Sequence, residues 1–385
     1  MMARLSLFLG LMTLGTTAPI TNEDPEVVAS RRITELSEQY QQNTICAISN
    51  STNGCTPQNI RRRKAWPALT DDEKRSFITS LHCLNTLPSQ TSTYHAPGAR
   101  TRYDDFIITH IDATDFVHAS GFFLPFHRHL LHLFESDLRS LCGYEGPMPY
   151  WDWTKSYLDP RGAEVFDGSD LSLGGNGAYI PGRKPTTIGL PGGFEKEIPP
   201  ATGGGCVTSG PFAEGKWEIR LGPVGFEPQG PDGGRGFNPR CLTRDLSAEF
   251  SKGTRPTAVT ELMDMCGDDL GCVNMEMDAP GGVPGGVHAS GHWQIGLDAL
   301  DVYASPSDPA FWLHHAQLDR VWTMWQGQDL AKRTYQVWGT MTAANVPPTP
   351  NVTLETMVDF GILAPSKPIR ELVSPIDGDY CYIYE

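Results

Sequence analysis

Apolar side chains recur at helical spacing in three segments of the N-terminal half. Residues 70–87 begin with a threonine cap and an acidic first turn, and then run apolar at helical intervals. Residues 104–119 and 126–141 show the same periodicity on either side of Pro125. Because proline suits the first turn of a helix, we predict three helices, with a sharp turn between the second and the third.

The C-terminal half predicts a long loop region followed by more helices. Residues 155–240 are rich in glycine and proline, which indicates a loop excursion with little regular structure. Helical patterns return over residues 245–277, 287–296 and 308–326, and the alternating aromatic tail at 380–385 is typical of an edge strand. The expected fold class is mainly α: a single-domain helical bundle with long loops and minor β structure.

Composition and charge restrict the partners. The chain has 385 residues, of which 39% are hydrophobic, and its formal net charge is -15. Such an acidic chain is repelled by phosphate backbones and by anionic lipid surfaces. We therefore expect no nucleic-acid partner and no membrane partner, whereas a small neutral substrate is compatible with the charge. The sequence does not indicate an oligomeric state.

The N-terminus is typical of a secretory signal peptide. Arg4 precedes a short apolar run, and small residues up to Ala18 form a cleavage site. We predict that residues 1–18 are a signal peptide, that residues 19–385 form the mature domain, and that the protein is secreted and extracellular.

The cysteines and two glycosylation sequons agree with secretion. Sequons occur at Asn50 and Asn351, and nine cysteines fit an oxidising compartment. An odd number of cysteines leaves at least one thiol outside the intramolecular pairs. The candidate bridges are Cys266–Cys272, Cys46–Cys55 and Cys83–Cys142.

Histidines gather on the second and third predicted helices. His110 and His118 are eight residues apart, which places them about 80° apart around a helix and on one broad face. His127 follows Pro125, where the chain turns back toward that face. Several imidazoles on one buried surface suggest a shared ligand. The other histidines of this half point away from this face or lack a spaced partner: His82, His95, His129 and His132.

A second histidine group lies near the C-terminus. His288 and His292 are four residues apart and therefore lie on one helix face. His314 and His315 are adjacent and point about 100° apart, so only one of them can join the group. His315 carries Asp319 one turn later, which favours it as a ligand with carboxylate support.

Two groups of three histidines therefore arise, without carboxylates or thiolates at ligand spacing. A set of neutral imidazoles suits copper or zinc, and copper has the higher intrinsic affinity. Hydrolytic two-metal sites usually include carboxylates, which disfavours a zinc-dependent hydrolase. We expect the fold to surround a dinuclear copper site, with reduced dioxygen as the natural bridge. The two groups are His110, His118 and His127, and His288, His292 and His315.

Two segments resemble the copper motifs of a known family. HASGFFLPFHR at 118–128 and DPAFWLHHAQLDRVW at 308–322 are similar to those of the type-3 copper proteins. The resemblance is to the short secreted tyrosinase and catechol oxidase (polyphenol oxidase) group of fungi. PYWDW at 149–153 and Tyr382-Ile-Tyr384 resemble further features of that family. The resemblance extends from about residue 60 to residue 384 and identifies the copper domain.

This resemblance implies an enzyme with two copper ions that oxidises o-diphenols to o-quinones, with O2 as co-substrate. It implies that His110, His118 and His127 hold the first copper, and that His288, His292 and His315 hold the second. His110 is the least constrained, because the family's first ligand lies at a variable distance. Several relatives attach that ligand to a cysteine by a thioether. Either this crosslink is absent here, which we favour, or His82, beside Cys83, takes the role.

The resemblance also assigns the surroundings of the site. Ala289 and Trp293 would line the substrate mouth, and Asp319 would orient a ligand, with ion pairs to Arg128 and Arg320. Relatives that hydroxylate monophenols carry, at the position of Ala289, an asparagine that helps to hold a basic water. Alanine makes no side-chain hydrogen bond, so we expect a catechol oxidase acting on small phenols. The alternatives are a true tyrosinase and, less favoured, a hemocyanin-like oxygen-binding protein.

Overall fold

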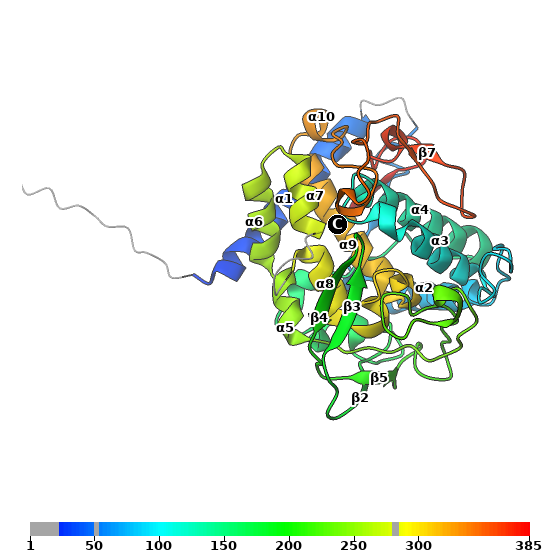
Figure 1. Ribbon diagram of the computed structural model, residues 1–385. Helices are drawn as coiled ribbons and strands as arrows, with labels where there is room; N and C mark the ends of the chain where they lie inside the picture. Colours follow the sequence, from blue (N-terminus) through cyan, green and yellow to red (C-terminus); the bar gives the residue numbers. More distant parts are fainter. Residues whose placement is uncertain (1–22, 50–53, 279–284) are drawn as a thin grey trace, which may run out of the picture.

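The computed structural model describes residues 23–49, 54–278 and 285–385. α-Helices are the main regular structure of these ranges, and short strands and loops lie around them (Figure 1). The α-helices are α1 (Pro25–Ser49), α2 (Asp71–Leu84), α3 (Arg102–Val117), α4 (Phe123–Cys142), α5 (Ala248–Ser251), α6 (Pro256–Cys266), α7 (Leu270–Asp278), α8 (Val287–Ile295), α9 (Ala310–Gly327) and α10 (Leu330–Arg333). The strands are β1 (Arg61–Arg63), β2 (Gly177–Tyr179), β3 (Thr186–Leu190), β4 (Phe194–Ile198), β5 (Gly204–Val207), β6 (Met357–Val358), β7 (Lys367–Pro368) and β8 (Tyr382–Tyr384).

Helix α9 is the centre of the bundle. All of its residues are buried, and α1, α4 and α8 pack against it (Figure 1). Where α4 meets α9, the rings of Phe134 and Trp312 stack with their centroids 3.5 Å apart. This helix is buried on every side although it is not uniformly apolar, and it carries His314 and His315 into the middle of the fold.

The predicted helices are confirmed, with small shifts at their ends. Thr70 caps α2, and its side chain and that of Glu73 form a reciprocal capping box. Helix α3 ends before His118, which is its C-cap residue. Helix α4 begins at Phe123, two residues before Pro125, and proline is tolerated there because first-turn amides need no intrahelical partner. The region 245–277 folds into α5, α6 and α7, as the periodicity indicates.

Two parts of the fold differ from the prediction. Helix α1 is not predicted, because its sequence is largely polar and its support comes from residues far away in the chain. The Gln41 side chain donates to the carbonyl of Tyr384, and the Asn43 side chain donates to the carbonyl of Gly327. The region 155–240, which predicts little regular structure, contains two antiparallel pairs, β2 with β5 and β3 with β4. These pairs are only three to five residues long, too short for a clear alternating pattern.

The aromatic tail is a strand, as predicted. Strand β8 pairs in parallel with β1, with Arg61 opposite Tyr382 and Arg63 opposite Tyr384. Strands β6 and β7 form a further antiparallel pair. The minor β structure thus connects the last residues of the chain to the segment that precedes α2.

The described residues contain four disulfides, of which three join distant parts of the chain and one closes a short loop. The predicted Cys83–Cys142 and Cys266–Cys272 bridges are present, and Cys206 pairs with Cys241. The predicted Cys46–Cys55 bridge is wrong, because Cys55 pairs with Cys381, 326 residues away. The β1–β8 pairing brings these two sulfurs together, which no local spacing indicates.

Of the features that predict secretion, the structure describes the glycosylation sequon at Asn351. Asn50 and the expected signal peptide, residues 1–18, lie outside the described residues, whereas Asn351 is exposed. Within the described ranges, none of the helices combines the length and the apolar character that a membrane crossing needs.

Candidate metal centre

Four helices bring the six predicted histidines into one buried cluster. His110 lies within α3 and His118 at its end, α4 supplies His127, α8 supplies His288 and His292, and α9 supplies His315. All six are at most 6% exposed. The two predicted groups face each other, because the ring of His127 stacks on that of His315 at 4.3 Å and the ring of His118 on that of His288 at 5.7 Å.

Hydrogen bonds fix which ring nitrogen carries the proton. Four histidines place Nδ1 against a backbone carbonyl, which can only accept, so Nδ1 is protonated and Nε2 presents a lone pair. The pairs are His110 with Tyr303 at 2.8 Å, His118 with Thr114 at 3.1 Å, His127 with Phe123 at 2.8 Å and His292 with Ala299 at 2.8 Å. These Nε2 atoms are thus prepared to bind a cation.

The Nε2 atoms converge inside the cluster, and those of His110 and His127 have no proton to share, because both rings carry it on Nδ1. Those of His110 and His127 are 3.4 Å apart, those of His292 and His315 are 3.1 Å apart, and that of His288 is buried without a hydrogen-bond partner among the described residues. Burial, reinforced by the neighbouring histidines, lowers the pKa values of His110, His127 and His292 well below the usual histidine value. The lone pairs of His110 and His127 repel one another at this distance unless a cation lies between them. Two groups of buried imidazoles with converging nitrogens therefore fit a pair of metal ions.

His314 lies next to this cluster, but both of its nitrogens are used. Trp153 Nε1 donates to Nδ1 at 3.2 Å, and Nε2 donates to the backbone carbonyl of His288 at 3.1 Å. The Nε2 of His315, in contrast, meets that of His292 inside the cluster. The structure thus places His315, and not His314, in the position that the helix geometry predicts for a ligand.

A carboxylate that the sequence analysis missed supports the second group. Asp278, the last residue of α7, accepts from His288 Nδ1 at 2.6 Å through one oxygen. Through its other oxygen it accepts from the backbone N–H of Ala119 at 2.5 Å. A carboxylate bonded to the outer nitrogen of a metal-binding histidine holds the ring and raises its basicity. Asp278 precedes His288 by ten residues and has no helical phase with it, so spacing carried no signal.

Asp319 bonds arginine and tyrosine side chains instead of the ligand histidine that it is expected to orient. Its carboxylate accepts from Arg128 at 2.7 Å and from the hydroxyls of Tyr382 and Tyr384 at 2.6 and 2.7 Å. Burial raises the pKa of this carboxyl, but the Arg128 and Arg63 guanidinium groups offset this and bring the pKa below its usual value. The predicted ion pair with Arg128 is therefore confirmed.

The predicted ion pair between Asp319 and Arg320 is wrong. Arg320 lies 3.9 Å from Asp152 instead, because adjacent residues of α9 point in different directions. Asp319 connects α4, α9 and the C-terminal strand, and its oxygens contact arginine and tyrosine side chains.

A small cavity of about 60 Å³ opens onto the histidines from one side. Ala289 and Trp293 line it, as the resemblance implies, and His118, His288 and His292 form its floor. The ring of Phe311 does not line this cavity and lies 4.2 Å from that of His315. The apolar wall of this cavity has no signal in the sequence, because it comes from the end of β3 and from segments distant along the chain: Leu190, Pro191, Leu300 and Val302.

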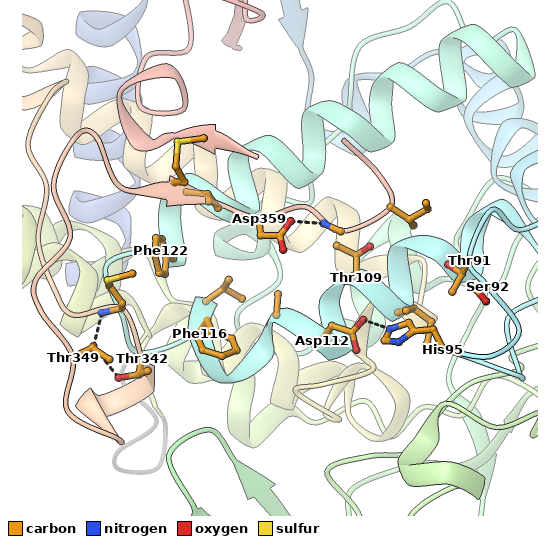
Figure 2. Close-up of a pocket in the computed structure, with 18 residues that line it drawn as sticks. Thr91, Ser92, His95, Thr109, Asp112, Phe116, Phe122, Thr342, Thr349 and Asp359 are labelled. Carbon is orange, nitrogen blue, oxygen red and sulfur yellow. Dashed lines mark hydrogen bonds and ion pairs between the residues drawn. The ribbon is translucent and has the colours of Figure 1, made fainter. Parts of the chain in front are cut away.

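A larger cavity of about 670 Å³ lies away from the cluster. Figure 2 shows its lining, with the His95–Asp112 pair at one end and Thr342 with Thr349 at the other. It includes none of the six clustered histidines. It is the larger of the two cavities, but the convergent imidazoles lie at the smaller one.

The alternative ligand His82 also lies outside the cluster. Its ring stacks on Phe212 at 5.0 Å, and the neighbouring Cys83 is bridged to Cys142. His110 lies beside His118 instead, with ring centroids 5.2 Å apart. His129 also lies outside the cluster, where its Nδ1 is hydrogen-bonded to the hydroxyl of Tyr380.

Comparison with known proteins identifies the family. Residues 100–328 match the common central domain of tyrosinase. The chain belongs to the tyrosinase family. It is 40% identical over 336 residues to tyrosinase P of Aspergillus terreus, which covers 86% of this chain and 93% of that protein. It is 37% identical over 357 residues to N-acetyl-6-hydroxytryptophan oxidase ivoB of Emericella nidulans, with 86% and 94% covered.

A solved structure of the tyrosinase family has the same fold. A variant of the polyphenol oxidase from Thermothelomyces thermophila matches with a TM-score of 0.86 and 35% identity, covering 92% of this chain and 98% of that one. Membership confirms the resemblance inferred from the two histidine motifs and the mainly helical fold class. The protein is a copper oxidoreductase of the tyrosinase and polyphenol oxidase type.

Proposed function

We propose that this protein is a catechol oxidase, which uses two copper ions and O2 to oxidise o-diphenols to o-quinones. Two diphenols together give up four electrons and four protons, and one dioxygen takes them up as two waters. When bound, copper supplies the electron transfer between the diphenol and dioxygen. The protein contributes the position of the metals, the approach of the ring and the exclusion of water.

The proposed metal ligands follow from the nitrogen geometry. One copper ion would be held by Nε2 of His110, His118 and His127, and the other by His288, His292 and His315. All of these except His315 have Nδ1 bonded to a carbonyl or to Asp278, which keeps the Nε2 lone pairs directed inward. A site preorganised by these hydrogen bonds binds metal without a large rearrangement of side chains.

The mouth of the site supports a small neutral ring as substrate. Of the described residues that line it, only Asp278 and the floor histidines are ionisable, and the remaining side chains are apolar. An apolar wall accepts the flat face of a phenol, while the hydroxyl groups turn to the floor. We therefore propose a small phenolic molecule as the substrate.

The described residues that line the mouth include no free base, and this observation carries the choice of catechol oxidase. A monophenol titrates near ~10 and needs a base in order to bind as phenolate at neutral pH. Ala289 has no polar atom in its side chain, and both oxygens of Asp278 already accept hydrogen bonds. Catechols lose a proton more easily and already carry the second oxygen. Tyrosinase activity remains the alternative, favoured by the name of the relative tyrosinase P.

A substrate panel on copper-loaded protein tests this proposal. We expect fast oxygen uptake with catechol and slow or lagging uptake with tyramine and tyrosine. The His292→Ala variant, which removes one proposed ligand, should bind one copper ion fewer and lose turnover. If wild-type protein hydroxylates tyrosine as fast as it oxidises catechol, tyrosinase is the correct function. If it binds oxygen reversibly and oxidises no phenol, it is an oxygen-binding protein.

We also propose that the enzyme is secreted as residues 19–385, with glycan at Asn351 and Asn50. The support is the sequence of the N-terminus, the four disulfides and the exposed position of Asn351. Mass spectrometry of the exported protein should find a mature N-terminus near Pro19. An intact Met1 on exported protein would contradict the proposal.

A further inference from the structure

The β3–β4 hairpin has one face directed at helix α8. Paired residues of an antiparallel hairpin share a face, and the register pairs Ile188 with Lys196 and Thr186 with Ile198. Ile188 and Ile198 on this inner face are buried, whereas Thr187 and Glu197, which form a pair on the outer face, are exposed. This alternation shows that the inner face is packed against the protein.

The inner face of the hairpin covers Trp293, which lines the proposed mouth together with Ala289. Ile188 and Ile198 form a small apolar cluster with Trp293 and Ala289, separate from the main core. Lys196, on the same face, places its ammonium 5.0 Å from the centre of the Trp293 ring. Trp293 is only 3% exposed as a result. The hairpin therefore fixes the indole and hides most of its flat face.

The tip of the hairpin reaches the cavity itself. Leu190, the last residue of β3, and the following Pro191 line the cavity opposite the histidines. The hairpin is held in place at Gly189, whose N–H donates to the carbonyl of Gly225 at 2.8 Å. Leu190 is half-buried and packs against the Trp293 cluster, so its side chain forms a firm wall.

We propose that the β3–β4 hairpin determines substrate size, and that Leu190 is the residue that limits it. This inference rests on the proposed phenol oxidation and names its substrate class: neutral, single-ring diphenols. The cavity between Leu190 and the histidine floor is about 60 Å³, and its other walls come from helix α8 and from Leu300 and Val302. A second ring attached opposite the hydroxyl groups would have to pass the hairpin tip.

Two opposite substitutions at Leu190 test this inference. Leu190→Ala should widen the mouth and raise kcat/KM for biphenyl-3,4-diol relative to catechol by about ten-fold, a usual size effect in an apolar pocket. Leu190→Trp should lower the same ratio. Thr187→Ala is the matched control, because it shortens a side chain on the outer face of the same strand. Copper per chain is measured for each variant.

A binding measurement tests the steric effect of Leu190 independently of the oxidation reaction. Benzyl alcohol and biphenyl-4-ylmethanol are neutral rings that the enzyme is not expected to oxidise, and calorimetry on copper-loaded protein gives their dissociation constants. Leu190→Ala should improve binding of the two-ring compound relative to the one-ring compound, and Thr187→Ala should not change it. Unchanged binding and kcat/KM ratios in both Leu190 variants would overturn the inference and leave catechol oxidation intact. Failure of copper-loaded wild type to oxidise catechol would refute the proposed function, while the binding ratios still test the hairpin.

Discussion

Replacing Asp278 with asparagine should weaken the second copper site without unfolding the protein. The carboxylate uses one oxygen for His288 Nδ1 and the other for the N–H of Ala119. An amide has only one acceptor oxygen, and its nitrogen cannot accept, so Asp278→Asn leaves one of these two donors without a partner. Loss of the carboxylate also frees the imidazole of His288 to change its tautomer.

The size of the effect follows from the role of such partners. Removing the group bonded to a metal-binding histidine costs about 10–100-fold in metal affinity. That is about 1.4–2.8 kcal/mol for one copper ion of the pair. Equilibrium dialysis of Asp278→Asn against a chelator, with copper per chain measured by atomic absorption, should show one ion leaving at a lower chelator concentration than in wild type. The other ion should leave at nearly the wild-type concentration.

Asp319→Asn is the matched control, because it changes a buried carboxylate that bonds arginine and tyrosine groups. Breaking its contact with Arg128 costs about 3–5 kcal/mol of folding stability, the usual range for a broken buried pair. We expect a lower melting temperature with copper affinity retained. The reasoning is refuted if Asp278→Asn binds copper like wild type while Asp319→Asn loses it.

Three further predictions concern the ligands, the mouth and the fold. His314→Gln should keep both copper ions and His315→Gln should lose one, as measured by copper per chain; the reverse result would mean that α9 is rotated from its described orientation. Ala289→Asn should raise the ratio of tyramine to catechol turnover, because the amide can hold a water at the mouth; an unchanged ratio would remove the argument from this position. Cys381→Ser breaks the bridge to Cys55, which closes a 326-residue separation, and should lower the free energy of unfolding by about 2–5 kcal/mol in a denaturant titration. A variant as stable as wild type would show that the β1–β8 pairing needs no bridge.

The sequence by itself determined the parts of the site that have a local period. The eight-residue spacing of His110 and His118 and the four-residue spacing of His288 and His292 place each pair on one helix face. The same period separates His315 from His314, and the structure finds His315 in the cluster and His314 bonded elsewhere. These relations depend only on the geometry of a single helix, which the chain carries wherever the helix is placed.

Only the tertiary structure decided which distant residues meet at the site. Asp278 reaches His288 because α7 packs against α8, and Leu190 reaches the mouth because a hairpin folds over Trp293. Cys55 meets Cys381 through a parallel strand pair, although Cys46 is much nearer along the chain. Each of these contacts depends on how separate elements pack, and side-chain packing between elements has no repeat along the sequence. A hydrogen bond or a wall formed in this way therefore has no local signal, even when both partners are visible in the chain.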